Sequence, residues 1–365
     1  MEREQLPLII FVGPGGASDP ERWVSAACRA NACDLAARAL ERPCLRPIVI
    51  ASPKADWASL PGGVELLPDP PGEPFHFGRR LRQVAAQFGW ERLLYIGGGA
   101  GPLLSASDLE TLAQRALALG QGVITNNLYS TDLLALAPVA ALDRIELPAS
   151  DNDLAWRLRA AGLPVESLPA SAATRLDLDT PHDLAIAARH PACGPALRRL
   201  VESLPLDPAP LERVLAELRN PRGEVLVYGR TSAATWARLE RLPCQTRIFS
   251  EERGMRASGR LARGEVCAWL GALLEQVGAE AFFQSLAGAC TAAIMDTRPL
   301  WAHLKLWPTA SDRFYADLLQ PGRINDPTLR ALTEAACRAP VPLLLGGQGL
   351  VSGDLLALAE IAEGK

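Results

Sequence analysis

The sequence has little of several features that would assign it to a class of proteins at once. Aromatic residues make up 5% of its 365 residues, and histidine occurs four times. No apolar run approaches the roughly 20 residues that a transmembrane helix needs. The first residues lead straight into a strand-like run and lack the layout of a signal peptide. We therefore expect a cytoplasmic protein with no membrane partner.

A basic excess and closely spaced cysteines are missing as well. The formal net charge is −4, and the 37 Lys and Arg residues are spread along the chain, which argues against a nucleic-acid partner. The eight cysteines include no pair with two residues between them, the spacing that many zinc sites use. Small buried thiols in a reducing compartment are the better interpretation.

The main pattern in the sequence is a series of apolar runs that alternate with helix-like stretches. Strands buried on both faces appear as continuous apolar runs, and helices between them imply a mostly parallel sheet. The runs in the first half are residues 6–12, 47–51, 64–67, 92–96, 122–125 and 165–168, and those in the second half are 224–228, 246–249, 292–295 and 341–345. Prolines cluster between His190 and Arg222. We expect an α/β fold with a first domain over residues 1–195 and a second, smaller, helix-rich α/β domain over residues 215–365.

The residues that follow the strands are the first candidates for a binding site. In open parallel sheets, ligands bind beyond the carboxyl ends of the strands, and glycines there let the backbone approach a phosphate. Lys54, after the second strand, is either a phosphate contact or a solvated loop residue. The candidate nucleotide-binding residues are Gly13, Gly15, Gly16, Gly98, Gly99 and Asn126.

Two segments resemble one protein family. Tyr95–Leu109 reads as a strand, a glycine-rich turn, Pro-Leu-Leu and a helix start with Asp-Leu, and Leu176–Leu184 contains Asp-Leu-Asp-Thr-Pro-His-Asp-Leu. In this order and spacing they resemble the middle and late motifs of the nucleotidyltransferase-like GT-A family. The most similar types are the phospholactate guanylyltransferases and the molybdenum-cofactor nucleotidyltransferases. The resemblance covers about residues 5–190 and implies a Rossmann-like GT-A domain.

The resemblance also implies a chemistry. A phosphorylated small molecule would attack the α-phosphate of a nucleoside triphosphate, pyrophosphate would leave, and Mg²⁺ held by Asp177 and Asp179 would bridge the phosphates. The carboxylate that the family carries in its middle motif aligns with Ala100, which cannot bind a metal. Asp19, Asp132 or Asp151 can replace it, or catalysis can be lost.

Two further interpretations therefore stay open beside the enzyme. One is a non-catalytic nucleotide-binding or regulatory protein, in which the domain serves as a ligand sensor or as a homo-oligomer scaffold. The weaker one is a glycosyltransferase that uses a nucleotide sugar, because Asp177 and Asp179 have the spacing of a DxD metal motif. That motif normally lies in the middle of its domain, whereas this pair lies near the end.

The second half carries arginines after its expected strands. Arg253 and Arg256 follow one strand, and Arg298 follows the next. Arginine forks bind carboxylates and phosphates in a bidentate manner, so these residues suit an anionic small molecule. The alternative is an internal ion-pair network with Glu251 or Glu252. His303 lies near the same cluster, where a structural role is the more common one.

Overall fold

The computed structural model describes residues 4–53, 57, 60–256 and 258–364. Its contacts divide the chain into two compact units. The first unit contains the chain up to Pro14 and then Ser25–Asp177 and Gly194–Leu197. The second unit contains Gly15–Val24, Leu178–Cys193 and the chain from Arg198 onward. The expected domains 1–195 and 215–365 stay a prediction.

The first unit is built on a seven-stranded sheet with the order β3-β2-β1-β4-β6-β5-β7. All neighbouring strands are parallel except β6, which is antiparallel to both β4 and β5. Its strands are β1 (Leu6–Phe11), β2 (Leu45–Ser52), β3 (Val64–Pro68), β4 (Leu93–Gly97), β5 (Gly122–Thr125), β6 (Leu133–Ala137) and β7 (Val165–Ser167). The expected mostly parallel α/β sheet is confirmed.

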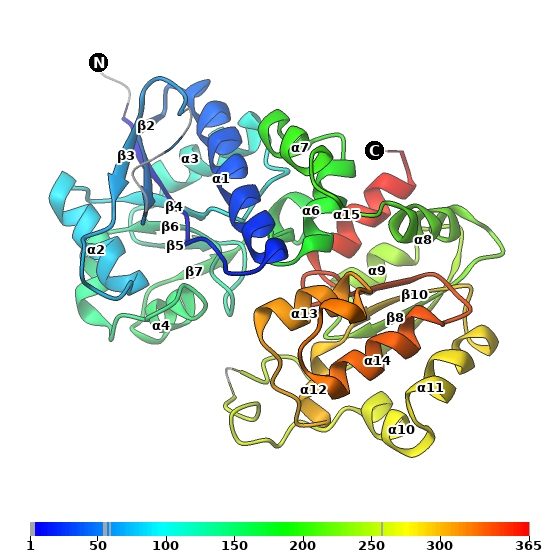
Figure 1. Cartoon of the computed structure of the whole chain (residues 1–365). Helices are drawn as coiled ribbons and strands as arrows, with labels where there is room; N and C mark the ends of the chain where they lie inside the picture. Colours follow the sequence, from blue (N-terminus) through cyan, green and yellow to red (C-terminus); the bar gives the residue numbers. More distant parts are fainter. Residues whose placement is uncertain (1–3, 54–56, 58–59, 257, 365) are drawn as a thin grey trace. The chain divides into compact units, whose positions relative to one another are not determined.

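Helices cover both faces of this sheet (Figure 1). Apolar side chains of α1 and α3 pack on one face, and those of α2, α4 and the 3₁₀ turn η1 pack on the other. The strands therefore bury both faces, which explains their continuous apolar runs. The bounds are α1 (Asp19–Leu40), α2 (Phe77–Phe88), α3 (Ala106–Leu117), η1 (Val139–Arg144), α4 (Leu154–Ala160) and α5 (Ala172–Arg175).

Strand β6 is the element of the first unit that the sequence pattern did not predict. Its five residues, Leu133–Ala137, are all buried, and it runs against its neighbours. Because β6 is antiparallel, its first residue lies at the same edge of the sheet as the carboxyl ends of β4 and β5. Asp132, which directly precedes β6, thereby comes to the edge where parallel sheets bind ligands.

The second unit contains a parallel four-stranded sheet with the order β11-β10-β8-β9. Its strands are β8 (Glu224–Gly229), β9 (Gln245–Ser250), β10 (Ala292–Asp296) and β11 (Leu343–Gly346). The sequence runs predicted all four within a few residues. The strand order reverses direction between β8 and β10, so the carboxyl ends of these two strands flank a topological switch point.

Many helices surround this smaller sheet (Figure 1). Side chains of α10, α11, α12, α13 and α14 form one apolar cluster with the strands, whereas α8 packs against β8, β10 and β11 together with α15. Among the helices of the described residues, none combines the length and the apolar run needed to cross a bilayer. The bounds are α6 (Pro181–Arg189), α7 (Pro195–Glu202), α8 (Ala209–Arg219), α9 (Ala233–Leu239), α10 (Trp269–Val277), α11 (Ala279–Ser285), η2 (Leu286–Gly288), α12 (Arg298–His303), α13 (Ala310–Asp317), η3 (Pro321–Arg323), α14 (Pro327–Cys337) and α15 (Gly353–Ala362).

Candidate functional site

The glycine-rich turn after β4 lies directly against the end of β1. The Gly98 N–H donates to the carbonyl oxygen of Phe11 at 2.7 Å. A Cβ at Gly98 would lie 3.0 Å from that oxygen and 3.0 Å from Val12 Cγ2, so a side chain there would crowd β1. The Gly97 N–H donates to the carbonyl oxygen of Asp132 at 2.8 Å. The turn is thus held between the end of β1 and the start of β6.

Ala100, which the resemblance aligns with the family's middle-motif carboxylate, is buried and forms an antiparallel β-bridge with Asp177. The side chain of Asn31 in α1 fixes the same turn. Its fully buried amide donates to the carbonyl oxygens of Gly98 at 2.8 Å and of Ala100 at 3.0 Å. The late motif therefore begins beside the middle motif, and half-buried Asp177 is the late-motif carboxylate that the bridge brings to this turn.

Tyr95 of β4 is the centre of an acidic group at this edge. Its buried hydroxyl donates to Asp151 Oδ2 at 2.9 Å. Burial, followed by the negative charges of Asp151, Asp132 and Asp177, raises the pKa of Tyr95 well above its ordinary value. Burial also raises the pKa of Asp151, and the hydrogen bond from Tyr95 opposes that rise. Three carboxylates thus act on one phenol at the carboxyl edge of the sheet.

Asn126 serves mainly to shape the turn between β5 and β6. Its side-chain oxygen accepts from the Leu133 N–H at 3.1 Å, and its side-chain nitrogen donates to Asp132 Oδ2 at 3.1 Å. Ser130 Oγ donates to Asp132 Oδ1 at 3.2 Å. These bonds position Asp132, which is half-buried, rather than leave the Asn126 amide facing outward. The sequence identified Asn126 as a ligand contact, and the structure gives it a structural partner as well.

The glycines in the loop after β1 differ in how much space surrounds them. A Cβ at Gly13 or Gly15 would have no neighbour within 4 Å, whereas one at Gly16 would lie 2.1 Å from Glu21 Cβ. Gly16 is therefore required by the start of α1. Gly99 is half-buried beside Gly98, and Lys54 lies outside the described residues.

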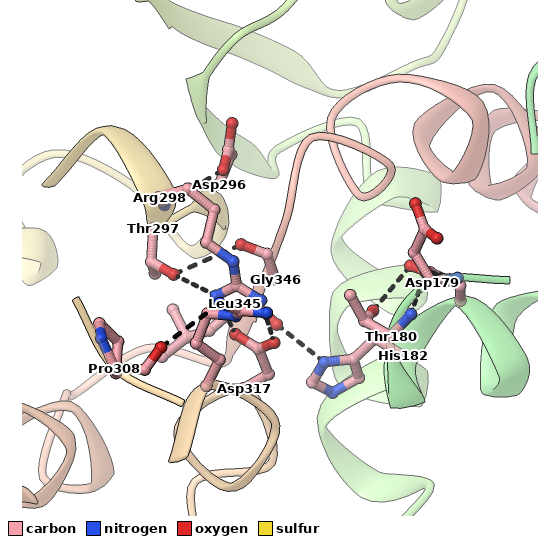
Figure 2. A network of polar contacts seen from close by, with 12 residues as sticks. Asp179, Thr180, His182, Asp296, Thr297, Arg298, Pro308, Asp317, Leu345 and Gly346 are labelled. Carbon is pink, nitrogen blue, oxygen red and sulfur yellow. Dashed lines mark hydrogen bonds and ion pairs between the residues drawn. The ribbon is translucent and has the colours of Figure 1, made fainter. Parts of the chain in front are cut away.

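The rest of the late motif belongs to the second unit. Thr180 is the N-cap of α6, Pro181 occupies its first turn, and Asp183 completes the capping box. Asp179 is exposed, its N–H donates to Asp183 Oδ2 at 2.8 Å, and its side chain points away from Arg298 (Figure 2). The motif therefore has a structural function from Thr180 onward.

Polar side chains at the carboxyl ends of β10 and β11 form an internal network (Figure 2). Arg298 donates to both carboxylate oxygens of the fully buried Asp317, at 2.9 and 2.6 Å, and its guanidinium lies 4.3 Å from the centre of the Trp301 ring. His182 Nδ1 lies 2.9 Å from the Leu345 carbonyl oxygen, and burial lowers the pKa of His182. The Arg298 fork is therefore engaged by a carboxylate of its own unit.

The other predicted arginines of the second unit are exposed. Arg253 and Arg256 both lie at the surface. Arg313 of α13 is half-buried, and burial together with the charges of Arg298 and Arg256 lowers its pKa. The anion contacts expected from the sequence do not include Arg313, which lies inside a helix rather than directly after a strand. Whether this cationic group binds an anion stays a prediction.

The remaining polar residues of this sheet have structural partners. Arg230, directly after β8, binds the fully buried Asp296 with Nε–Oδ2 at 2.6 Å and Nη2–Oδ1 at 3.1 Å. His303 Nδ1 accepts from the Ala268 N–H at 3.2 Å, and its Nε2 lies 3.1 Å from Glu275. The switch point between β8 and β10 is thus closed by an ion pair.

Comparison with known proteins leaves the family open. No family model matches the chain, and no curated protein matches it. Among solved structures, a cytidylyltransferase from Leptospira borgpetersenii serovar Hardjo-bovis (strain JB197) covers 55% of this chain and 93% of its own, with 11% sequence identity and a TM-score of 0.37. A likeness at that level carries no functional argument.

Proposed function

We propose that the first unit binds a nucleoside triphosphate together with Mg²⁺ and acts as a nucleotidyltransferase-like domain. The observation that carries the proposal is the acidic group around Tyr95, at the edge where parallel sheets bind ligands. In this proposal Asp132 and Asp177 face the metal-bound phosphates, and the turn at Gly98 lets the triphosphate approach the backbone. Asp151 has a raised pKa and a hydrogen bond to Tyr95, and it positions the neighbouring loop.

The donor set fits a metal that arrives with its substrate. Among the described residues, no group of three or more His, Cys, Asp or Glu side chains is arranged to hold a metal ion. Mg²⁺ is usually bound through one or two carboxylates, several waters and the substrate phosphates rather than by an all-protein cage. Two carboxylates at the edge of β4 and β6 match that requirement. When bound, Mg²⁺ would neutralise phosphate charge during attack at the α-phosphate.

A second candidate is a domain that binds the nucleotide without transferring it. The buried Ala100 at the middle-motif position favours it, because one carboxylate of the family pattern is absent. Asp132 comes from the turn before β6 and is already hydrogen-bonded by Asn126 and Ser130. If Asp132 does not reach the metal, binding can persist while transfer is lost.

Triphosphate binding is tested by thermal unfolding of the full chain with each of the four ribonucleoside triphosphates, with and without MgCl₂. A ligand that binds only the folded state raises the unfolding temperature. We expect Mg²⁺-dependent stabilisation that Asp177→Asn and Asp132→Asn each abolish. The matched control is Asp143→Asn, an exposed carboxylate of the same unit that pairs with Arg82. Stabilisation that both site variants retain would refute the proposed site, and no stabilisation by any nucleotide would refute the function.

Transfer is tested separately by pyrophosphate release from the stabilising triphosphate in the presence of phosphorylated small molecules. Release that depends on an acceptor identifies a transferase. Stabilisation without release from any acceptor in the panel favours the non-catalytic candidate. Asp179→Asn belongs in the same series, because the resemblance implies a metal-binding role for Asp179. Stabilisation by a nucleotide sugar in place of a triphosphate would favour the glycosyltransferase.

A further inference from the structure

Three large apolar side chains of the first unit are strongly exposed, and all three lie at the carboxyl edge of its sheet. Phe75 precedes α2, Tyr129 lies in the turn between β5 and β6, and Trp156 lies in the first turn of α4. Their exposed fractions are 54%, 62% and 44%. Large exposed aromatics gathered at one edge are unusual for a surface that only faces water.

Tyr129 and Trp156 form a stacked pair. Their ring centres are 5.4 Å apart and their planes differ by 29°. A stacked pair of exposed rings can extend to a third ring, because every nucleobase or aromatic ring offers a π face. Phe75 differs, because its ring meets Phe11 edge-on at 82° and 6.0 Å. The Tyr129–Trp156 pair is therefore the surface suited to stacking.

Hydrogen bonds fix the backbone segments that carry the two rings. The Tyr129 N–H donates to Asn127 Oδ1 at 3.2 Å, which fixes the turn that carries this ring. The fully buried Thr131 accepts from the N–H of Ala155, the residue before Trp156, at 3.2 Å. The turn and the start of α4 are thus joined, so the two rings are presented in a preorganised position.

The pair also shares its loop with a carboxylate of the proposed phosphate site. Ser130, directly after Tyr129, donates to Asp132 Oδ1 at 3.2 Å. Asp151, which accepts from the Tyr95 hydroxyl, lies five residues before Trp156 in the segment that enters α4. Both rings are therefore attached to the segments that carry the acidic group.

The geometry points to the Tyr129–Trp156 pair as a ring-binding subsite, which stacks a planar aromatic or heteroaromatic ring of the ligand whose phosphates bind beside Asp132. This inference rests on the proposed triphosphate site. The ring belongs either to the nucleobase or to the phosphorylated acceptor, and both sources present the same π face and a linked phosphate. Stacking tolerates ring identity, so the subsite selects for a flat ring rather than for one base.

The test measures dissociation constants of the full chain for the four Mg²⁺–nucleoside triphosphates, for Mg²⁺–tripolyphosphate and for phenyl phosphate. Tripolyphosphate carries the phosphates without a ring, and phenyl phosphate carries a ring on one phosphate. The variants are Trp156→Ala and Trp156→Phe, with Tyr129→Ala beside them. The matched control is Trp236→Ala, which removes a tryptophan that is 52% exposed in the second unit.

Replacing a base-stacking aromatic by alanine weakens binding roughly 5- to 150-fold. We expect Trp156→Ala to weaken the binding of a ring-bearing ligand by a factor in that range, and Trp156→Phe to restore most of the lost affinity. The affinity for tripolyphosphate should stay unchanged. If Trp156→Ala lowers affinity only for the triphosphates, the stacked ring is the nucleobase. If it lowers affinity only for phenyl phosphate, the stacked ring belongs to the acceptor.

Two outcomes overturn the inference. In the first, Trp156→Ala leaves the affinity for every ring-bearing ligand unchanged. In the second, Trp156→Ala weakens tripolyphosphate binding to the same extent, which would indicate general damage to the loop. Failure of the proposed function looks different. In that case no triphosphate or tripolyphosphate binds, whereas phenyl phosphate would still bind in a Trp156-dependent manner if the ring subsite exists.

Discussion

The replacement Asp354→Asn should flatten the pH dependence of stability. Asp183 and Asp354 are both fully buried in the second unit, and Asp354 raises the pKa of Asp183 through its negative charge and through hydrogen bonding between the two carboxyl groups. Asp183 also accepts from the Asp179 N–H and from Thr180 Oγ1, each at 2.8 Å. Two carboxyl groups can share a hydrogen bond only when one of them carries a proton. The folded protein therefore retains a proton at a pH where an ordinary aspartate has lost it.

The sign follows from the direction of the shift. Burial, and then the charge of Asp354, raise the pKa of Asp183 well above its ordinary value. Above about pH 4 the unfolded chain releases this proton while the folded chain keeps it. The free energy of unfolding then falls as pH rises, by up to about 1.4 kcal/mol per pH unit for one proton, until the folded pKa is passed.

The assay is denaturant unfolding of the full chain, followed by tryptophan fluorescence, between about pH 5 and about pH 8. Asp354→Asn removes one charge and offers an amide donor to Asp183, so the variant should lose most of the downward slope. Asp143→Asn, at an exposed position of the first unit, is the control and should leave the slope unchanged. A variant that keeps the wild-type slope would refute the reasoning. Asp183→Asn is not used, because it would also disturb the cap of α6.

Four further substitutions test single contacts by the same unfolding measurement. Gly229→Ala should lower the free energy of unfolding by at least about 2 kcal/mol, because the φ angle is +128° and the new Cβ would lie 2.4 Å from Asp296 Cβ. Arg230→Met should cost about 3–5 kcal/mol, because it leaves the carboxylate of Asp296 buried without its ion-pair partner. Arg82→Met, which breaks an exposed pair, should cost at most about 1 kcal/mol, and equal costs for the two arginine variants would contradict the burial argument. Asn31→Ala should cost about 1–3 kcal/mol and weaken triphosphate binding, because it removes both hydrogen bonds to the turn after β4; unchanged binding would separate that turn from the site.

The sequence predicted the parallel strands well because each is buried on both faces. In β1 all six residues are buried, so an unbroken apolar run marks the strand. The run Leu133–Ala137 is equally buried, but it follows the polar segment after β5 with no helix between them. A pattern of strands joined by helices does not predict β6, because a short turn connects β6 to β5.

The site was predictable only where a motif is local. The Thr180–Asp183 capping box joins residues three positions apart, and the sequence shows it directly. The acidic group around Tyr95 joins residues from β4, the turn before β6, the segment before α4 and the start of the late motif. Such a group depends on the strand order, which the sequence pattern did not give for β6. From the sequence alone, Asp132 and Asp151 are therefore only alternatives for the middle-motif carboxylate.

The strand order also gives a physical reason for alanine at position 100. Ala100 is buried and stands opposite Asp177 in a β-bridge, so a carboxylate there would place two like charges on paired residues. Like charges directly opposite destabilise a strand pair, and a buried carboxylate without a cation costs several kcal/mol. With alanine in that place, the turn after β4 folds without a metal to neutralise it. Asp132 then contributes negative charge from the turn before β6, where hydrogen bonds from Asn126 and Ser130 already support it. In the proposed function, metal binding would therefore depend on the phosphates that accompany the metal, whereas the fold needs neither.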